Sequence, residues 1–370
     1  MNKFKFREEY LCYKIIKKLK LNLNGLNVLT EAASGYYSWT PILAALAGAN
    51  VLCFGKDSSY GLYKDNKDKI LNISQALNIN SKLNIVSKNS SYDKLEKINI
   101  VTNSGLLRPI DKNIISKLGK KSIISLMWET WEFRETDLDL MASQKYEIPV
   151  VGTNENFCDL KMHEYNGYYM LKLLFDMKIE VYHNHIVIFG HKPAFYCVEL
   201  FKRMGVKYTW FSPKKEDDSN SFLYSDIQNI FSLDHIDAII FADHESKHEI
   251  MGRKSKVSFT KLKSCFPQIR IGHVCGGIDV DELQETNLYY FPEKIQKVGF
   301  MSYQPDEIGA QPVLELFAAG LKVGEIAARA RLNGASVEEA IQATVDYGIG
   351  QDFDGGFMNF NPKKVGSHHD

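Results

Sequence analysis

The sequence has no excess of charge of either sign and few patterns that would hold a metal. Its 45 basic side chains balance 45 acidic ones, so the net charge is zero. Such a chain has no long-range field that would attract nucleic acid or an anionic membrane. The six cysteines form no C-x-x-C pair, and His244 and His248 have no clear third ligand nearby. We therefore expect no nucleic-acid partner, no metal and mostly reduced thiols.

Long apolar segments are also missing. Nowhere do about 18 apolar residues follow one another, as a membrane-spanning helix requires. The N-terminal segment carries charges throughout and lacks the apolar centre of a secretory signal. These absences predict a cytoplasmic protein without a membrane partner. Low-complexity tracts are absent as well, and 45% of the residues are hydrophobic, so we expect the chain to fold.

What the sequence does contain is an alternation of short apolar runs with longer segments of helical periodicity. This alternation is typical of a parallel sheet covered by helices. Because 370 residues exceed the size of one hydrophobic core, we predict an α/β fold of two doubly wound Rossmann-like domains with an interdomain cleft and C-terminal helices. The expected strands lie near 26–30, 50–54, 83–87, 98–102, 122–127 and 148–152, and then near 185–190, 206–211, 237–242, 269–274 and 287–292. The expected helices lie near 7–20, 38–48, 62–78, 111–119, 135–146, 193–204, 221–232 and 257–265.

The domain boundaries follow from this alternation. The expected segments are an N-terminal helix (1–20), a substrate-side α/β domain (21–155), a connecting helix (156–180), a Rossmann-like nucleotide-binding domain (181–298), C-terminal helices (299–350) and a tail (351–370). Asn333-Gly334, followed by Ser336 and Glu339, indicates a helix end and then a capping box. We expect the final helices to pack on the first domain or on the other protomer of a homodimer, and the tail to be loosely ordered.

The strand, turn and helix over residues 185–205 stand where a dinucleotide-binding turn belongs. Such a turn uses three glycines, in the pattern G-x-G-x-x-G, to bend, to admit a pyrophosphate and to pack the helix. Gly190 is present, whereas Lys192 and Phe195 occupy the other two positions. The turn therefore predicts either a phosphate site with Lys192 as a point charge or a plain connection between strand and helix.

The next strand ends without the acid that usually binds the ribose of NAD. Residues 212–215 read Ser-Pro-Lys-Lys, which favours the 2′-phosphate of NADP over NAD if a dinucleotide binds. A solvated surface loop is the alternative. The expected cofactor contacts, all at strand ends of the second domain, are Gly190, His191, Lys192, Ser212, Lys214, Ala242, Asp243, His273 and Gly276.

The segment RIGHVCGGIDVDEL at 270–283 carries a family resemblance. Gly272-His273 resembles the Gly-His step of S-adenosylhomocysteine hydrolases. Residues 275–279 resemble a stretch of D-2-hydroxyacid dehydrogenases, with Cys275 at the position of their arginine. Over about residues 25–350 the architecture resembles the two-domain formate/glycerate dehydrogenase superfamily, which also includes alanine dehydrogenase. The resemblance implies this fold and a nicotinamide cofactor, but the arginine that grips the substrate and the Pro-His pair of the hydroxyacid enzymes do not carry over.

The strands of the first domain are followed by polar and aromatic residues. Three successive strand ends of this kind would form the rim of a small-molecule site at the carboxyl edge of the sheet. The expected substrate contacts are Glu31, Ser34, Tyr36, Tyr37, Trp39, Tyr60, Asn103, Ser104 and Trp131. For residues 29–41, a loop that packs on the neighbouring domain is the alternative.

Three residues are candidates for proton transfer: Glu129, His273 and Asp57. Glu129 follows an apolar strand among tryptophans, where the charged form of a carboxyl group is disfavoured. The alternative for it is an interface acid paired with Arg134 or a lysine. His273 lies at a strand end and belongs to a residue type that titrates near neutral pH, so it could exchange a proton or hydrogen-bond a loop.

These observations predict an NAD(P)-dependent oxidoreductase that acts on a small polar metabolite, with Tyr36, Glu129 and His273 converging on the interdomain cleft. Two alternatives stay open. One is an enzyme like the homocysteine hydrolases, which uses a tightly held cofactor for hydrolysis or elimination. The other is a degenerate relative that binds a nucleotide or metabolite without redox turnover.

Overall fold

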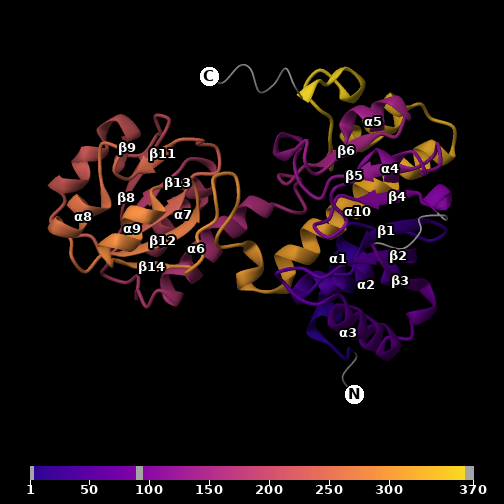
Figure 1. The fold of residues 1–370 in the computed structure, drawn as a ribbon, viewed down its shortest axis with the longest axis horizontal. Coiled ribbons are helices and arrows are strands. Elements are labelled where there is room, and N and C mark those ends of the chain that lie inside the picture. The colour runs from indigo at the N-terminus through magenta and orange to yellow at the C-terminus, as the bar shows by residue number, and fades with distance from the viewer. Residues whose placement is uncertain (1–3, 89–94, 363–370) are drawn as a thin grey trace. The chain divides into compact units, whose positions relative to one another are not determined.

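The computed structural model of the protein describes residues 4–88 and 95–362. The chain forms two compact units, drawn as ribbons in Figure 1. Unit 1 consists of Met1–Met162 and Ala310–Asp370, and unit 2 consists of His163–Gly309. Residues 1–3 of the expected N-terminal segment and residues 363–370 of the expected tail lie outside the described residues. The chain thus begins unit 1, forms unit 2 and returns to complete unit 1.

Unit 1 is built on a seven-stranded sheet whose first strand lies in the interior. From one edge to the other, the strands are β3 (Leu83–Ser87), β2 (Asn50–Gly55), β1 (Asn27–Glu31), β4 (Ile100–Thr102), β5 (Ile123–Ser125), β6 (Val150–Thr153) and β15 (Gly350–Gln351). All neighbours pair in parallel except β15, which runs antiparallel to β6. The six parallel strands confirm those expected for the first domain.

Helices pack around this sheet. They are α1 (Arg7–Lys18), α2 (Thr40–Leu46), α3 (Tyr63–Ala76), α4 (Lys112–Ile115), α5 (Leu140–Lys145), α10 (Ala310–Leu332) and α11 (Val337–Asp346), with the 3-10 helices η1 (Gly35–Trp39), η2 (Asn80–Lys82), η3 (Leu95–Lys97), η4 (Thr130–Glu132) and η8 (Phe357–Asn359). The expected capping box opens α11, because Ser336 Oγ accepts from the Glu339 amide and the Glu339 carboxylate accepts from the Ser336 amide. Over residues 4–88 and 95–362, no helix combines the length and the apolar character needed to cross a lipid bilayer.

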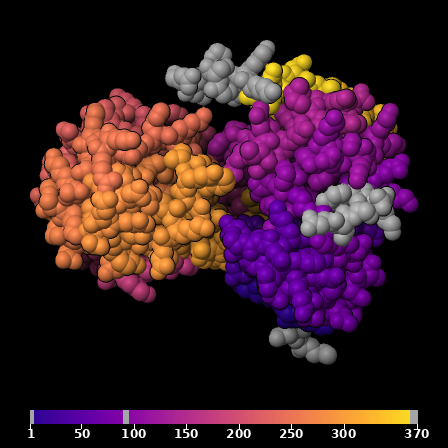
Figure 2. Space-filling model, viewed as in Figure 1, coloured from indigo at the N-terminus to yellow at the C-terminus, as the bar shows by residue number. Residues whose placement is uncertain are grey.

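The long helix α10 fills the middle of unit 1, where it packs against β4, β5 and β6. Its ribbon runs beside these strands in Figure 1, and the face of unit 1 in Figure 2 exposes almost none of it. Gly320 and Gly324 permit this approach, because an added Cβ would lie 2.3 Å from Met127 Cε and 2.6 Å from Ile100 Cγ2. Of the two expectations for the final helices, packing on the first domain is confirmed.

Unit 2 repeats the same order of strands in a six-stranded parallel sheet. Its strands are β9 (Ser221–Leu223), β8 (Lys207–Ser212), β7 (His185–Phe189), β10 (Ala238–Ala242), β12 (Arg270–Cys275) and β14 (Tyr289–Phe291), and β11 (Glu249–Met251) pairs separately with β13 (Gly277–Ile278). Its helices are α6 (Tyr165–Asp176), α7 (Lys192–Met204), α8 (Phe259–Cys265) and α9 (Val280–Thr286), with η5 (Met162–Glu164), η6 (Tyr224–Ser232) and η7 (Pro305–Ile308). Along β7, Ile186 and Ile188 enter one hydrophobic cluster while Val187 and Phe189 enter another. Burial of both faces explains why the strands read as continuous apolar runs.

Two local expectations are wrong. The segment near 221–232 is not one helix: it begins as β9, where Phe222 packs on Phe211 with 5.6 Å between ring centroids, and it continues as η6. The tail is not loosely ordered throughout, because β15 extends the sheet of unit 1 and Phe353 and Phe357 are buried. Aromatic residues scattered among glycines and asparagines are enough to anchor this segment in the core.

Candidate functional site

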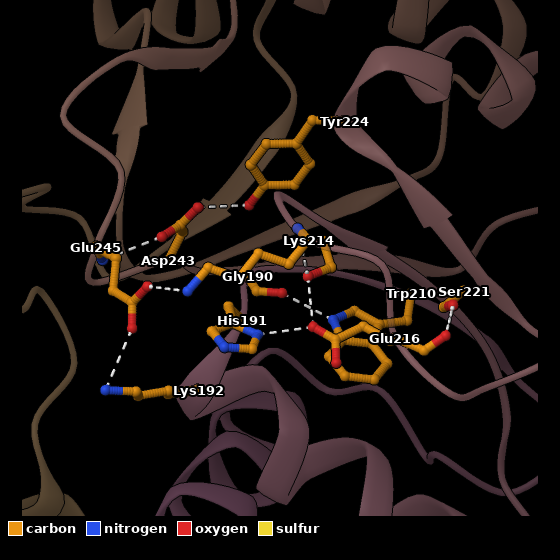
Figure 3. Close-up of polar contacts among 11 residues, drawn as sticks. Gly190, His191, Lys192, Trp210, Lys214, Glu216, Ser221, Tyr224, Asp243 and Glu245 are labelled. Atoms are coloured by element: carbon orange, nitrogen blue, oxygen red, sulfur yellow. Dashed lines mark hydrogen bonds and ion pairs between the residues drawn. The ribbon is translucent and has the colours of Figure 1, made fainter.

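The turn after β7 is the centre of a polar cluster in unit 2 (Figure 3). Gly190 has a φ of +144°, and a Cβ there would lie 2.1 Å from the carbonyl oxygen of Ala242 on β10. The carbonyl oxygen of Gly190 accepts a hydrogen bond of 2.8 Å from Trp210 Nε1 on β8. The turn is therefore locked against both neighbouring strands, and glycine is required there. α7 begins two residues later at Lys192, with Pro193 in its first turn.

This turn lies where the order of strands in the sheet reverses. β7 is the first strand of unit 2; the chain next adds β8 and β9 on one side of it, and then β10, β12 and β14 on the other. In open α/β sheets, ligands bind outside the carboxyl ends of the strands at such a switch point, and a helix N-terminus there attracts anions. The arrangement fits a nucleotide whose phosphates lie over the turn.

A carboxylate that the sequence interpretation passed over lies beside the turn. Glu216 Oε1 accepts a hydrogen bond of 2.6 Å from Ser212 Oγ and lies 2.7 Å from His191 Nδ1 (Figure 3). Only 13% of the Glu216 side chain is exposed. Glu216 belongs to the run Lys-Lys-Glu-Asp-Asp, which is typical of a solvated loop, but the chain folds back and turns Glu216 inward. Asp218 of the same run is also turned inward, with 2% of its side chain exposed.

The two lysines expected at a phosphate site share one acidic partner. Lys192 Nζ lies 3.5 Å from one oxygen of Glu245, and Lys214 Nζ lies 3.4 Å from the other. Both lysine side chains are 60% exposed, so a ligand phosphate could reach them. Next to them, the buried Asp243 accepts a hydrogen bond of 2.6 Å from the hydroxyl of Tyr224. Burial, together with the charge of Asp243, raises the pKa of Tyr224, so this hydroxyl stays a donor.

The structure therefore brings most of the expected cofactor contacts together at one sheet edge. Those around the turn are Gly190, His191, Lys192, Ser212, Lys214, Ala242 and Asp243. His273, at the end of β12, is fully buried, with Nδ1 2.8 Å from Ser302 Oγ and Nε2 3.1 Å from the carbonyl oxygen of Gly276. Burial lowers the pKa of His273 to about 4. These contacts match the alternative in which His273 hydrogen-bonds a loop, and its role in proton transfer stays a prediction.

The corresponding edge of unit 1 gathers polar side chains after β1 and β4. Glu31 ends β1, is 3% exposed, and accepts a hydrogen bond of 2.7 Å from the amide of Leu106. Burial raises the pKa of Glu31, although the charge of Arg108 opposes this shift. Asn103 and Ser104 directly follow β4 and are buried. Because β1 and β4 are neighbours, these expected substrate residues lie at adjacent strand ends.

The aromatic residues after β1 do not join the polar residues at the ends of β1 and β4. Tyr36 and Trp39, both in η1, line a hollow of about 760 Å³ together with Phe6 and residues of α3. The Trp39 ring packs edge-on against Phe6 at 5.5 Å and is buried. Ser34 and Tyr37 are half-buried. This part of the expected substrate group therefore faces the N-terminal segment and α3.

The loop after β2 supplies two further expected residues. Tyr60 is 72% exposed. Asp57 Oδ1 accepts a hydrogen bond of 2.7 Å from the amide of Tyr63, the first residue of α3. This contact gives Asp57 a structural role at a helix start, and its role as an acid or base stays a prediction.

Glu129 lies among other carboxyl groups after β5 and β6. It is 6% exposed, and its two oxygens accept hydrogen bonds from Trp131 Nε1 at 2.7 Å and from Gln351 Nε2 at 3.2 Å. Burial, followed by the charge of Glu129, raises the pKa of Glu132 to about 7. Burial also raises the pKa of Glu155, with the charges of Glu132 and Glu129 adding to it. Glu132 is thus a carboxyl group with a pKa near neutral pH in this cluster. The role of Glu129 in proton transfer stays a prediction.

Three residues that could matter for function were missed from the sequence: Glu216, Glu132 and Arg108. Each stands within six residues of a predicted strand end, which is the one signal that could have pointed to them. The expected interdomain cleft stays a prediction.

No protein-family model and no curated protein sequence matches the chain. Among solved structures, it is similar in fold to a chain of dipicolinate synthase from Bacillus subtilis, with a TM-score of 0.54 and 9% identity over 84% of this chain and 99% of that one. The corresponding chain of dipicolinate synthase from Bacillus halodurans gives a TM-score of 0.50 and 10% identity over 80% of this chain and 96% of that one. An NADPH-dependent glyoxylate/hydroxypyruvate reductase from Sinorhizobium meliloti gives a TM-score of 0.46 and 9% identity over 84% of this chain and 96% of that one. The similarity to the first two confirms the expected two-unit α/β fold.

Proposed function

We propose that the protein is a cytoplasmic oxidoreductase of a small polar metabolite that uses a nicotinamide dinucleotide bound at the carboxyl edge of the sheet of unit 2. The observation that carries this proposal is the Gly190 turn, which lies at the switch point of the sheet and has no room for a side chain against Ala242. The polar edge of unit 1, around Glu31 and Asn103, is the proposed substrate side.

The residues of the turn fit such a cofactor although two glycines of the usual pattern are replaced. The Lys192 side chain is 60% exposed and Phe195 is 43% exposed, so neither replacement is buried between helix and sheet, although the Phe195 ring lies 6.5 Å from that of Trp210 on β8. Fully buried Ala194 and Cys197 provide the helix packing instead. The amides that begin α7, with Lys192 and Lys214, would hold the phosphates, and the bound nicotinamide would supply the acceptor or donor of a hydride.

The position of Glu216 supports NAD rather than the NADP that the sequence favours. Its carboxylate lies beside the turn and the end of β8, where a dinucleotide of this fold places a ribose. The contacts with Ser212 and His191 both fall on Oε1, and within the described residues Oε2 is left to accept from ribose hydroxyls. A 2′-phosphate at this position would meet the negative charge of Glu216 instead.

Titration of the purified protein with NADH and NADPH, followed by quenching of tryptophan fluorescence, tests this proposal. We expect saturable quenching by both nucleotides, with tighter binding of NADH. Lys192→Glu should weaken NADH binding about tenfold, because it reverses a charge at the turn. Lys207→Glu is the matched control, since Lys207 is an exposed residue that begins β8 at the opposite edge of the sheet. Equal affinity of Lys192→Glu and wild type would remove the turn from the binding site.

One observation favours a second candidate, a protein that binds a nucleotide without redox turnover. Glu245 already pairs with both lysines of the turn, so a phosphate must compete with a resident carboxylate. Quenching by adenine nucleotides that equals quenching by NADH would favour this candidate, since it would show that the nicotinamide adds no affinity.

A further inference from the structure

Glu245 lies between the two lysines beside the turn of unit 2 (Figure 3). One of its carboxylate oxygens is 3.5 Å from Lys192 Nζ, and the other is 3.4 Å from Lys214 Nζ. The two lysines come from different elements, since Lys192 begins α7 and Lys214 follows β8. The carboxylate of Glu245 therefore bridges two ammonium groups, as a phosphate group also can.

The loop between β10 and β11 holds the backbone of Glu245 in this place. Asp243 is the first residue of the loop, and it is buried. Its Oδ1 accepts hydrogen bonds from the amides of Glu245 at 3.1 Å and Ser246 at 2.9 Å, and its Oδ2 accepts one of 2.6 Å from the hydroxyl of Tyr224. An Asx turn of this kind fixes the local backbone. The backbone of Glu245 is thus anchored, while its carboxylate is held by the ion pairs with the two lysines.

The acids drawn at this sheet edge differ in how firmly their carboxylates are held. Glu216 contacts Ser212 and His191, and 13% of its side chain is exposed. Asp243 is 1% exposed. The Glu245 side chain is 30% exposed, and both of its lysine partners are 60% exposed. Ion pairs between exposed side chains contribute little free energy, so of these three carboxylates that of Glu245 leaves its position at the smallest cost.

The charges of the two loops and of the start of α7 nearly cancel. They are the lysines Lys192, Lys214, Lys215 and Lys247 and the acids Glu216, Asp217, Asp218, Asp243 and Glu245, with His191, His244 and His248 as further titratable groups. Asp218 pairs with Lys202 farther along α7. The remaining four acids offset the four lysines, so a phosphate that arrives while Glu245 is in place gains little net attraction. Once the Glu245 side chain moves away, Lys192 and Lys214 can pair with the phosphate instead.

We propose that Glu245 is an autoinhibitory residue: its carboxylate competes with the phosphate groups of a ligand for Lys192 and Lys214 and moves out when they bind. Because the competitor is part of the chain, its effective concentration is constant. It lowers the affinity for every ligand that places a phosphate on these lysines and leaves contacts to a nucleoside unchanged. That the displacing ligand is a nicotinamide dinucleotide rests on the proposed function, whereas the competition between Glu245 and phosphate does not.

Calorimetric titration of the full chain at constant ionic strength tests this competition. The probes are inorganic pyrophosphate, ADP, NADH and, as a ligand without phosphate, adenosine. Glu245→Gln keeps the size of the side chain and removes its charge, so the three phosphate ligands should bind about fivefold more tightly while the affinity for adenosine stays the same. Glu199→Gln is the matched control, because it removes one negative charge from an acid on α7 whose side chain is 41% exposed, and it should match wild type.

A double-mutant cycle with Lys214 tests the bridging contact itself. Lys192 takes part in a further interaction, so Lys214 is the better partner for the cycle. Lys214→Gln alone should weaken pyrophosphate binding about threefold. In that background Glu245→Gln should tighten binding only about twofold, because one of the two ion pairs is already absent. A gain from Glu245→Gln that is equal with and without Lys214 would show a general effect of charge and would disprove the bridge.

The outcomes separate this proposal from the proposed function. If Glu245→Gln tightens the binding of pyrophosphate and ADP while neither wild type nor the variant binds NADH, the competition stands and the oxidoreductase proposal fails. If NADH binds to both with equal affinity, the dinucleotide site stands and the autoinhibition is wrong. Absence of pyrophosphate binding to wild type and to Glu245→Gln would overturn the autoinhibition as well.

Discussion

The carboxyl edges of the two sheets share an order of strands but differ in how their polar groups are satisfied. In unit 2, Glu216 contacts His191 and Ser212, and Glu245 pairs with two lysines. In unit 1, Asn103 Oδ1 and Arg108 Nε in the loop after β4 and Trp128 Nε1 after β5 are buried and have no hydrogen-bond partner within the described chain. The shared topology determines the sheet edge at which ligands bind. The side chains determine whether the polar groups at that edge pair with one another or lack hydrogen-bond partners.

The largest effect is expected from substituting Gly190, the glycine in the turn after β7 of unit 2. Gly190→Ala would place a Cβ 2.1 Å from the carbonyl oxygen of Ala242, so the strand ends must separate. We expect loss of NADH binding and a decrease of about 2–4 kcal/mol in the free energy of unfolding, measured by urea denaturation. Gly205→Ala is the control: Gly205 also has a positive φ, but no atom lies within 4 Å of its Cβ position. The control should cost about 1 kcal/mol and retain NADH binding.

A smaller effect is expected in unit 1, where Glu132 should make the free energy of unfolding depend on pH. Because burial raises the pKa of Glu132 to about 7, the folded state holds its proton more tightly than the unfolded state does. The stabilisation is therefore complete below pH of about 4.5 and is lost as the pH rises through about 7. Glu132→Gln should reduce the loss of stability between pH 5 and pH 8 by about 1–2 kcal/mol, as measured by urea denaturation at both pH values.

Glu135→Gln changes an exposed neighbour in the same way and serves as the control for this experiment. A pH dependence that is identical in wild type and Glu132→Gln would show that Glu132 is ionised throughout this range, which would contradict its raised pKa.

The smallest expected effect concerns the choice of nucleotide in unit 2. Glu216→Gln removes a negative charge beside the turn while keeping an acceptor for the hydrogen bond from Ser212. The ratio of NADPH to NADH affinity, measured by fluorescence quenching, should rise roughly fivefold, which corresponds to about 1 kcal/mol. An unchanged ratio would mean that Glu216 does not face the ribose.

The sequence was informative wherever local physics determines the structure. The inner parallel strands are buried on both faces and so read as apolar runs, and the capping box at Ser336 and Glu339 is complete within four residues. Gly190 could also be identified, because the turn is a local feature. The strand-ending residues Asn103 and Ser104 were found by the same reasoning.

Contacts between distant segments could not be predicted. Glu129 is bonded to Gln351, which is 222 residues away in the chain, and Glu31 is bonded to an amide 75 residues away. Glu216 is turned inward by its contact with His191, which lies 25 residues earlier in the chain. A charged run that is typical of a solvated loop therefore contains an acid whose side chain is only 13% exposed. Composition and periodicity carry no information on such pairings, and burial then sets which carboxyl group changes its pKa.

The return of the chain to unit 1 has a consequence for its biosynthesis. β7–β14 and their helices are contiguous, so unit 2 can acquire its native structure on the ribosome as soon as residues 163–309 have emerged. Unit 1 cannot, because α10 and β15 follow unit 2 in the chain, and until they are translated β4, β5 and β6 leave apolar surface uncovered. Unit 1 is thus begun before unit 2 and completed after it, and during that interval its exposed apolar strands are the part of the chain most prone to aggregate.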